Sequence, residues 1–212
     1  MTARLADGQA SAAATRHTVL LLGGTAEARE LAARLAGQPG LRLISSLAGR
    51  VRDPALPAGE VRTGGFGGAD GLAGWLTGQR ASAVIDATHP FAEKISASAA
   101  AACARTGTPL LCLIRPPWTA SPGDDWRHAD SLPAAAALLP GLGRRAFLTT
   151  GRQGLAAFAA VDQVWFLIRC VDPPAPPLPA ARQVILARGP YHCGAELTLM
   201  REHGIDLLVT KN

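Results

Sequence analysis

The stretch HTVLLLGGTAEARELAARLA, residues 17–36, joins an apolar run, a glycine turn and an amphipathic segment. The apolar run predicts a strand over His17–Leu22, and the apolar spacing after the turn predicts a helix over Ala26–Ala36. A strand, a tight turn and a helix in this order open a βαβ unit. The stretch therefore points to the α/β fold class.

Short apolar runs keep alternating with helical patterns after this unit. They predict strands at Leu41–Leu47, Gly59–Thr63, Ala83–Asp86 and Leu110–Ile114, with helices at Ala69–Gly78 and Phe91–Thr106. Pro90 suits the start of the last of these helices, because proline is favoured at the first helical position. Strands separated by helices predict a mainly parallel sheet that is covered on both faces.

A polar stretch with several prolines interrupts the alternation at residues 116–130, where we expect a linker between two domains. Helix and strand patterns then resume at Ser131–Leu139, Ala146–Thr149, Leu155–Ala160, Gln163–Cys170, Gln183–Leu186, Ala195–His203 and Asp206–Thr210. The expected organisation is a loose tail over 1–16, a first domain over 17–115 and a second, smaller α/β domain over 131–212.

Composition limits the function classes. Hydrophobic residues make up 48% of the 212 residues and charged residues 17%, which excludes a fully disordered chain. The net charge is +5, and every basic residue except Lys94 and Lys211 is arginine. One explanation of the many arginines is G+C-rich coding, which favours arginine at exposed positions. The alternative is that the forked guanidinium groups bind a polyanionic small molecule. The arginines are scattered, which argues against nucleic acid as a partner.

Two further features bear on the setting of the protein. The cysteines have neither a C-x-x-C pair nor zinc-site spacing, so we expect no metal and interpret them as small buried hydrophobes in a reducing compartment: Cys103, Cys112, Cys170 and Cys193. The sequence has no apolar core typical of a signal peptide and no window of 18 apolar residues. A cytoplasmic protein without a membrane partner is expected.

The glycine turn of residues 23–25 is the first candidate ligand site. Gly23, Gly24, Thr25 and Ala26 lie between a strand and a helix, where backbone N–H groups and the positive helix end can hold a phosphate. The turn lacks a full G-x-G-x-x-G pattern, so an ordinary βα turn is the alternative.

Residues after the second strand indicate which nucleotide would bind. Ser45, Ser46, Gly49 and Arg50 stand where enzymes that use NAD carry an acidic residue for the ribose. Hydroxyls followed by arginine suit a 2′-phosphate, which makes NADPH the expected cofactor. A solvated basic loop is the alternative.

Two more strand ends carry candidate residues. Gly65 and Phe66 belong to a glycine-rich loop whose backbone can lie against a flat ligand, unless it is simply a flexible connection. Thr88 and His89 follow the fourth strand and point toward the expected cofactor. His89 is a candidate to bind the cofactor or to donate a proton; alternatively, Thr88 caps the next helix and His89 is a solvated loop residue.

Basic residues recur at strand ends of the second half. Thr150, Gly151 and Arg152 follow a strand and precede a predicted helix, which is typical of an anion site. Arg188 and Lys211 occupy comparable positions, so three cations are expected along one edge of this half. Each alone is more often a surface cation, but together they suggest capture of several carboxylates.

The order of the motifs resembles that of the precorrin-6A reductase family. The motifs that carry the resemblance are those at residues 23–29, 46–50, 63–68, 86–92, 149–152, 188–191 and 209–212, together with Arg115 and Trp118. The order and spacing agree over nearly the whole chain after the tail. Two departures are Tyr191, where phenylalanine is common, and the end at Asn212, where family members usually continue through a further helix and strand. The resemblance therefore predicts that the second domain is truncated.

The resemblance implies two Rossmann-like halves with mainly parallel sheets and an active-site cleft between them. It implies NADPH-dependent reduction of precorrin-6A to precorrin-6B in cobalamin biosynthesis, with hydride transfer to C19. Thr88 and His89 would lie near the nicotinamide. The tetrapyrrole carboxylates would be bound by Thr150, Gly151, Arg152, Arg188, Tyr191, Lys211 and Asn212.

Other readings stay open at this point. One is the cobalt-precorrin-6A reductase of the anaerobic pathway, and another is an NADPH reductase of a different substrate on the same fold. A third is a non-catalytic carrier of a nucleotide or a tetrapyrrole. A monomer or a weak homo-oligomer is expected in each case.

The nucleotide assignment can be tested by one substitution. Arg50→Ala is expected to weaken NADPH binding far more than NADH binding, because only NADPH carries the 2′-phosphate that the guanidinium would contact. Titration of both nucleotides measures this. Equal losses for the two would contradict the assignment of Arg50.

Overall fold

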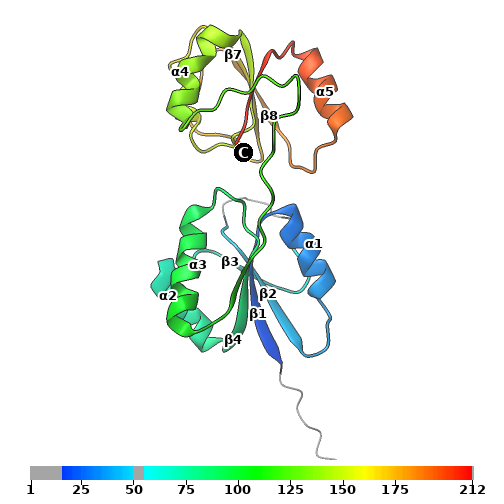
Figure 1. The fold of residues 1–212 in the computed structure, drawn as a ribbon, viewed down its shortest axis with the longest axis vertical. Coiled ribbons are helices and arrows are strands. Elements are labelled where there is room, and N and C mark those ends of the chain that lie inside the picture. Colours follow the sequence, from blue (N-terminus) through cyan, green and yellow to red (C-terminus); the bar gives the residue numbers. More distant parts are fainter. Residues whose placement is uncertain (1–15, 50–54, 212) are drawn as a thin grey trace, which may run out of the picture. The chain divides into compact units, whose positions relative to one another are not determined.

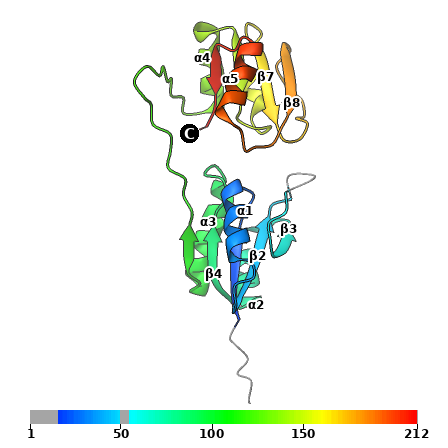
Figure 2. The same ribbon diagram turned by 90° about the vertical axis from the view of Figure 1, so that its right-hand side faces the viewer.

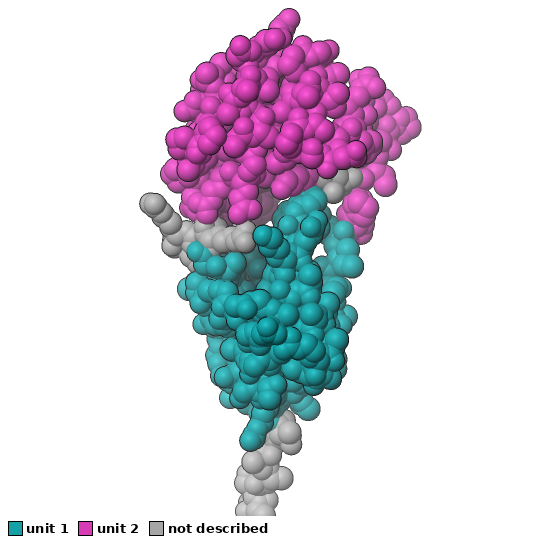
Figure 3. Space-filling model, turned by 90° about the vertical axis from the view of Figure 1, so that its left-hand side faces the viewer, with its two compact units in different colours: residues 1–115 teal, residues 116–212 magenta. Residues whose placement is uncertain are grey.

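The computed structural model describes residues 16–49 and 55–211, and the chain divides into two compact units, Met1–Arg115 and Pro116–Asn212 (Figure 3). Each unit is an α/β fold with a parallel sheet. In the described part of the chain, no helix is long and apolar enough to cross a membrane.

The sheet of the first unit has five strands in the order β3-β2-β1-β4-β5. Figure 2 labels β2, β3 and β4 of this sheet. Its elements are β1 (His17–Leu22), α1 (Ala26–Leu35), β2 (Leu41–Leu47), β3 (Glu60–Thr63), α2 (Gly68–Gly78), β4 (Ala81–Asp86), α3 (Glu93–Thr106) and β5 (Leu110–Cys112). The order reverses at β1, which pairs with β2 on one side and with β4 on the other. Such a reversal is the topological switch point where open α/β sheets bind ligands.

Helices cover both faces of this sheet, as the alternating strand pattern predicted (Figure 1). Leu20, Leu22 and Val84 pack against α2 and α3 on one face. Leu21 and Leu43 pack against Ala28 and Ala32 of α1 on the other. The central strand therefore buries side chains on both faces, which explains its unbroken apolar sequence.

The second unit has a four-stranded parallel sheet in the order β8-β7-β6-β9. Its elements are α4 (Leu132–Leu142), β6 (Arg145–Leu148), the 3₁₀ turn η1 (Leu155–Phe158), β7 (Trp165–Cys170), β8 (Arg182–Leu186), α5 (Cys193–Glu202) and β9 (Leu207–Val209). Helices α4 and α5 lie on opposite faces of the sheet (Figure 1). Phe158 and Phe166 meet edge to face in its core, with ring centroids 6.0 Å apart.

Several element boundaries differ from those expected. The helix after β4 begins at Glu93 rather than beside Pro90, because residues 87–92 first form a turn. The segment expected as a helix at Leu155–Ala160 is a single 3₁₀ turn. Cys103 and Cys170 are buried as expected, whereas Cys112 and Cys193 are exposed, because one ends an edge strand and the other begins a helix that buries none of its residues.

The close approach of α2 to the preceding loop gives a stability prediction. A Cβ at Gly71 would lie 1.7 Å from the carbonyl oxygen of Phe66, whereas a Cβ at Gly74 of the same helix meets nothing within 4 Å. Gly71→Ala should therefore destabilise the first unit by about 1–3 kcal/mol through overpacking. Gly74→Ala should stabilise it by up to about 1 kcal/mol through helix propensity.

Urea unfolding followed by circular dichroism compares these two variants with the wild type. Because both substitutions replace glycine by alanine in α2, the propensity term is shared. Equal unfolding midpoints for the two variants would contradict the predicted close approach of α2 to the Phe66 carbonyl.

Candidate active site

The carboxyl ends of β1, β2, β3 and β4 lie side by side in the sheet of the first unit. Leu22 at the end of β1 pairs with Ser46 of β2 and with Asp86 of β4. Leu47 of β2 pairs in turn with Thr63 of β3. The loops that follow these strands therefore leave the sheet along one carboxyl edge, where α/β proteins bind ligands.

The glycine turn is fixed to both neighbouring strands. Gly23 N–H donates to the carbonyl of Ser46 at 3.0 Å, on the β2 side. The hydroxyl of Thr25 donates to the carbonyl of Ala87 at 2.9 Å, on the β4 side, and accepts the N–H of Ala28 at 3.0 Å. Thr25 is thus both the N-cap of α1 and a link across the switch point.

This turn has the features of a phosphate site. Gly24 has a φ of +117°, a conformation that side chains rarely adopt. Ala26 and Glu27 begin α1, so their N–H groups have no acceptor within the helix. The turn residues predicted from the sequence, Gly23 to Ala26, therefore sit together at a helix N-terminus that can bind a diphosphate.

The end of β2 presents two buried serines. Ser45 Oγ makes no hydrogen bond within the described residues, whereas Ser46 Oγ accepts one from Arg62 at 3.1 Å. A buried hydroxyl without a partner is costly, so Ser45 suits contact with a polar ligand group. Gly49 follows with a φ of +70°, next to Thr63. Arg50 lies outside the described residues.

The glycine-rich loop after β3 folds around Arg62. The guanidinium donates to the carbonyls of Gly64 at 2.8 Å and of Gly65 at 3.1 Å, and its carbon lies 3.8 Å from the centroid of the Phe66 ring. Phe66 also meets Trp75 of α2 edge to face at 5.6 Å. The loop residues predicted to lie against a flat ligand are therefore held by one arginine.

Asp86 organises the turn after β4. This buried carboxylate accepts the N–H of Thr88 at 3.0 Å and its hydroxyl at 2.7 Å. Thr88 Oγ1 also lies 3.5 Å from Ser96 Oγ of α3. Thr88 does not cap this helix, whose N-cap is Ala92. The hydroxyl of Thr88 therefore fixes the turn that carries His89.

His89 is exposed at the tip of this turn. Its Nδ1 accepts the N–H of Phe91 at 3.4 Å, and the two rings lie 5.0 Å apart. The turn therefore presents the imidazole of His89 at the carboxyl edge of the sheet.

In the second unit, Arg152 is accompanied by an acidic residue. Its guanidinium lies 3.6 Å from Oδ2 of Asp172, which follows β7. Asp172 Oδ2 and Thr150 Oγ1 are buried and form no hydrogen bond within the described residues. The helix expected to follow Gly151 is only the 3₁₀ turn η1, so no α-helix N-terminus is available there to bind an anion. The polar groups at this end of the sheet are instead the side chains of Thr150, Arg152 and Asp172.

The predicted substrate residues are distributed along the carboxyl edge of this sheet. Arg188 follows the edge strand β8, and Lys211 follows β9 at the opposite edge. Three strand spacings separate these two strands, which amounts to about 14 Å. The cations are therefore spread over the width of a large ligand. Asn212 lies outside the described residues.

Tyr191 stacks on the guanidinium of Arg169. Its hydroxyl donates to the carbonyl of Ala187 at 2.9 Å, and the guanidinium carbon of Arg169 lies 3.6 Å from its ring centroid. Arg169 is almost completely buried and forms an ion pair with Glu196 of α5 at 2.6 Å. These contacts fix the loop that carries Arg188.

Sequence reasoning missed four of these residues. Arg62, Asp86, Arg169 and Asp172 were not candidates, although each is a charged residue within or just after an apolar strand. That position is a usable signal, because a charge there requires a partner or a ligand. Within the described residues, no group of three or more His, Cys, Asp or Glu is arranged to hold a metal ion.

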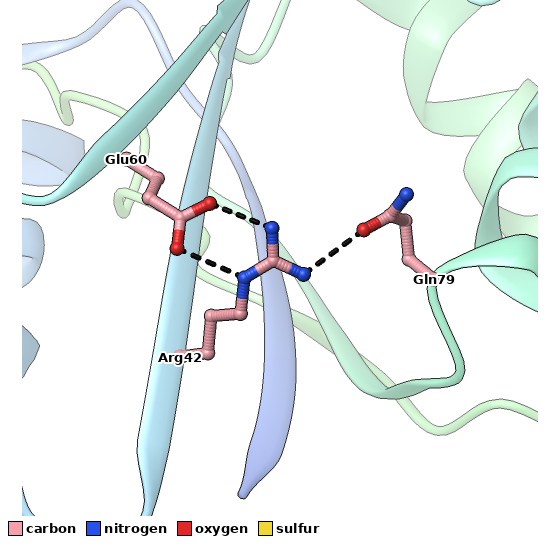
Figure 4. Close-up of polar contacts among 3 residues, drawn as sticks. All are labelled: Arg42, Glu60 and Gln79. Atoms are coloured by element: carbon pink, nitrogen blue, oxygen red, sulfur yellow. Dashed lines mark hydrogen bonds and ion pairs between the residues drawn. The ribbon is translucent and has the colours of Figure 1, made fainter.

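The opposite, amino-terminal edge of the first sheet has compensated charges. Arg42 makes two hydrogen bonds to the carboxylate of Glu60, at 2.9 and 2.7 Å, and a third to the side chain of Gln79 at 3.0 Å (Figure 4). The hydrogen bond to Arg42 lowers the pKa of Glu60, and the same contact raises the pKa of Arg42. By contrast, burial lowers the pKa of Arg62.

Comparison with known proteins adds a family match. The model of the family described as "Precorrin-6x reductase CbiJ/CobK" matches residues 18–212. A precorrin-6A reductase of Rhodococcus erythropolis is 57% identical over 194 residues, which cover 92% of this chain and 78% of the relative. A cobalt-precorrin-6A reductase of Salmonella typhimurium is 30% identical over 154 residues, which cover 67% of this chain and 54% of that relative.

A solved structure shares the fold. The structure of a CobK precorrin-6A reductase superposes with a TM-score of 0.85 at 45% sequence identity, and the match covers 91% of this chain and 76% of that one. The α/β architecture with parallel sheets therefore agrees with that of an experimentally determined relative.

The pair of Arg42 and Glu60 predicts a pH dependence of stability. Because the folded pKa of Glu60 lies below its ordinary value near 4.5, the pair stabilises the protein above that pH and the effect is lost as the pH falls through the folded pKa. Glu60→Gln should lower the free energy of unfolding by less than about 1 kcal/mol at neutral pH, since both side chains are partly exposed.

Urea unfolding between neutral and acidic pH measures this difference. A double-mutant cycle of Glu60→Gln, Arg42→Gln and the double variant isolates the contribution of the pair. A difference between wild type and Glu60→Gln that persists unchanged below the folded pKa would contradict the prediction.

Proposed function

The chain belongs to the precorrin-6x reductase CbiJ/CobK family, and we propose that it reduces a ring double bond of precorrin-6A to give precorrin-6B in cobalamin biosynthesis, with NADPH as reductant. One observation supports this most directly. The hydrogen bond from Thr25 to the Ala87 carbonyl joins the phosphate-type turn to the strand end that carries Thr88 and His89. A nucleotide site and a proton donor are thereby adjacent on one sheet edge.

The first unit binds the cofactor in this proposal. Gly23, Gly24, Thr25 and Ala26 hold the diphosphate through backbone N–H groups. Ser45, Ser46, Gly49 and Arg50 bind the adenosine ribose and its 2′-phosphate, and Gly65 and Phe66 cover the bound nucleotide. The positive φ of Gly24 and the buried hydroxyl of Ser45 are the features that fit this group.

The reaction requires a hydride and a proton. NADPH, when bound, supplies the hydride that is added to C19 of the macrocycle. His89, in its protonated imidazolium form, supplies the proton that is added at C18 and becomes neutral, while Asp86 and Thr88 hold the turn in place. Water and a carboxylic acid of the substrate are the competing proton sources.

The second unit binds the carboxylates of the tetrapyrrole. The residues proposed for this are Thr150, Gly151, Arg152, Arg188, Tyr191, Lys211 and Asn212. Charge-assisted hydrogen bonds to arginine are strong and directional, which suits a substrate with many acetate and propionate groups. The spacing of β8 and β9 at opposite edges of the sheet matches the width of such a ring system better than that of a small anion.

Metal-free precorrin-6A is the proposed substrate rather than its cobalt form. Identity to the Rhodococcus relative is almost twice that to the Salmonella relative, whose name specifies the cobalt substrate. A cytoplasmic location, a monomeric or weakly associated state and the absence of a nucleic-acid partner stay predictions from the sequence.

The reaction can be tested anaerobically with purified protein. We expect NADPH absorbance at 340 nm to fall when precorrin-6A is added and to stay constant without a tetrapyrrole. Oxidation should be much slower when NADH replaces NADPH or when the cobalt form replaces precorrin-6A. Binding of both ligands without turnover would contradict a catalytic role and support a carrier. NADPH oxidation with another substrate alone would contradict the assigned reaction.

Substitution of Arg152 tests the substrate site in the same assay. Arg152→Gln should raise KM for precorrin-6A about tenfold or more, since a charged contact is worth roughly 1.5–3 kcal/mol, and leave NADPH affinity unchanged. Arg144→Gln, just before the other end of β6, serves as the control. An equal effect of both variants would contradict a specific role for Arg152.

A further inference from the structure

Arg62 lies where a Rossmann-type sheet contacts the adenosine ribose. It is the third residue of β3 and pairs with Ser46, the penultimate residue of β2. In dinucleotide-binding sheets, the residue at the end of the second strand contacts the ribose hydroxyls. The guanidinium of Arg62 reaches this point, because it donates to Ser46 Oγ at 3.1 Å.

The guanidinium is held rigidly by neutral groups. It donates to the hydroxyl of Ser46 and to the carbonyls of Gly64 and Gly65, and it stacks on the ring of Phe66 at 3.8 Å. These contacts come from β2, from the glycine-rich loop and from an aromatic ring. A guanidinium fixed on several sides loses little further side-chain entropy when it binds a ligand.

The charge of Arg62 is uncompensated within the described residues. No carboxylate there lies within 4.0 Å of its nitrogens, whereas Arg42, on the other end of the same strand pair, has Glu60 at 2.7 Å. Arg62 is partly buried, and burial alone lowers its pKa. A partly desolvated cation with only neutral partners is stabilised by a bound anion.

Ser46 adds a donor at the same place. Its oxygen accepts from Arg62, so its own proton remains for a second acceptor. A guanidinium and a hydroxyl side by side match a phosphomonoester, which offers several acceptor oxygens.

We infer that Arg62, together with Ser46, binds the 2′-phosphate of NADPH and is a specificity-determining residue for NADPH over NADH. The inference rests on the proposed function, because it takes the nucleotide site of the first unit as given. The sequence alone assigned the preference for NADPH over NADH to Arg50. The inference adds Arg62, a residue that the structure describes.

Binding of two adenosine nucleotides tests the inference without turnover. Calorimetric titration of the whole chain with 2′,5′-ADP and with 5′-ADP separates the 2′-phosphate from the rest of the nucleotide. Arg62→Gln should weaken 2′,5′-ADP about tenfold or more and 5′-ADP less than about threefold, as expected for loss of one charged contact. Arg42→Gln, on the other end of β2, should change neither affinity by more than about threefold.

Two further variants separate recognition from loop structure. Arg62→Lys keeps the charge without the fork, so the affinity for 2′,5′-ADP should lie between those of wild type and Arg62→Gln. Ser46→Ala should also lower the affinity for 2′,5′-ADP selectively, and this variant applies if Arg62→Gln does not fold. Equal losses for both nucleotides in the folded variants would overturn the inference, because Arg62 would then only position the loop.

The nucleotide affinities of the wild-type protein distinguish an incorrect role of Arg62 from an incorrect proposed function. Wild-type protein that binds 5′-ADP as tightly as 2′,5′-ADP overturns the role of Arg62 and leaves a nucleotide site. Wild-type protein that binds neither nucleotide nor NADPH overturns the proposed function and the inference together.

Discussion

Parallel pairing of β1 with both β2 and β4 is the constraint on which the first unit depends. The pairing makes β1 the centre of the sheet, where Leu20, Leu21 and Leu22 are almost completely buried. It also sets the strand ends at one level, so that the glycine turn can contact β2 through Gly23 and β4 through Thr25. The candidate site is therefore a consequence of strand register rather than of any single loop.

Charge is distributed differently at the two ends of this sheet. At the amino-terminal edge, Arg42 forms an ion pair with Glu60, so its charge is neutralised without a ligand. At the carboxyl edge, Arg62 is surrounded by hydroxyl and carbonyl groups within the described residues. One arginine thus ties neighbouring strands together, while the other leaves a positive charge at the edge that binds ligands in this fold class.

The second unit uses partly buried acidic residues to orient its cations. Asp172 accompanies Arg152, and Glu196 forms an ion pair with Arg169, which in turn stacks on Tyr191. A cation that is partly neutralised and fixed in direction can bind a carboxylate without a large reorganisation of its surroundings. The same acidic partners keep several arginines on one sheet from repelling one another.

The sequence alone determined the alternation of strands and helices, the α/β class and the candidates that follow a strand. Apolar runs and glycine turns are local signals, so β1 and β2 have the predicted boundaries and Gly23 to Ala26 lie at the predicted turn. Only the tertiary structure decided which strands are neighbours, because pairing joins residues far apart in the chain. That pairing brought Thr25 to Ala87 and Arg62 to Ser46, replaced a predicted helix by the turn η1, and exposed Cys112 on an edge strand.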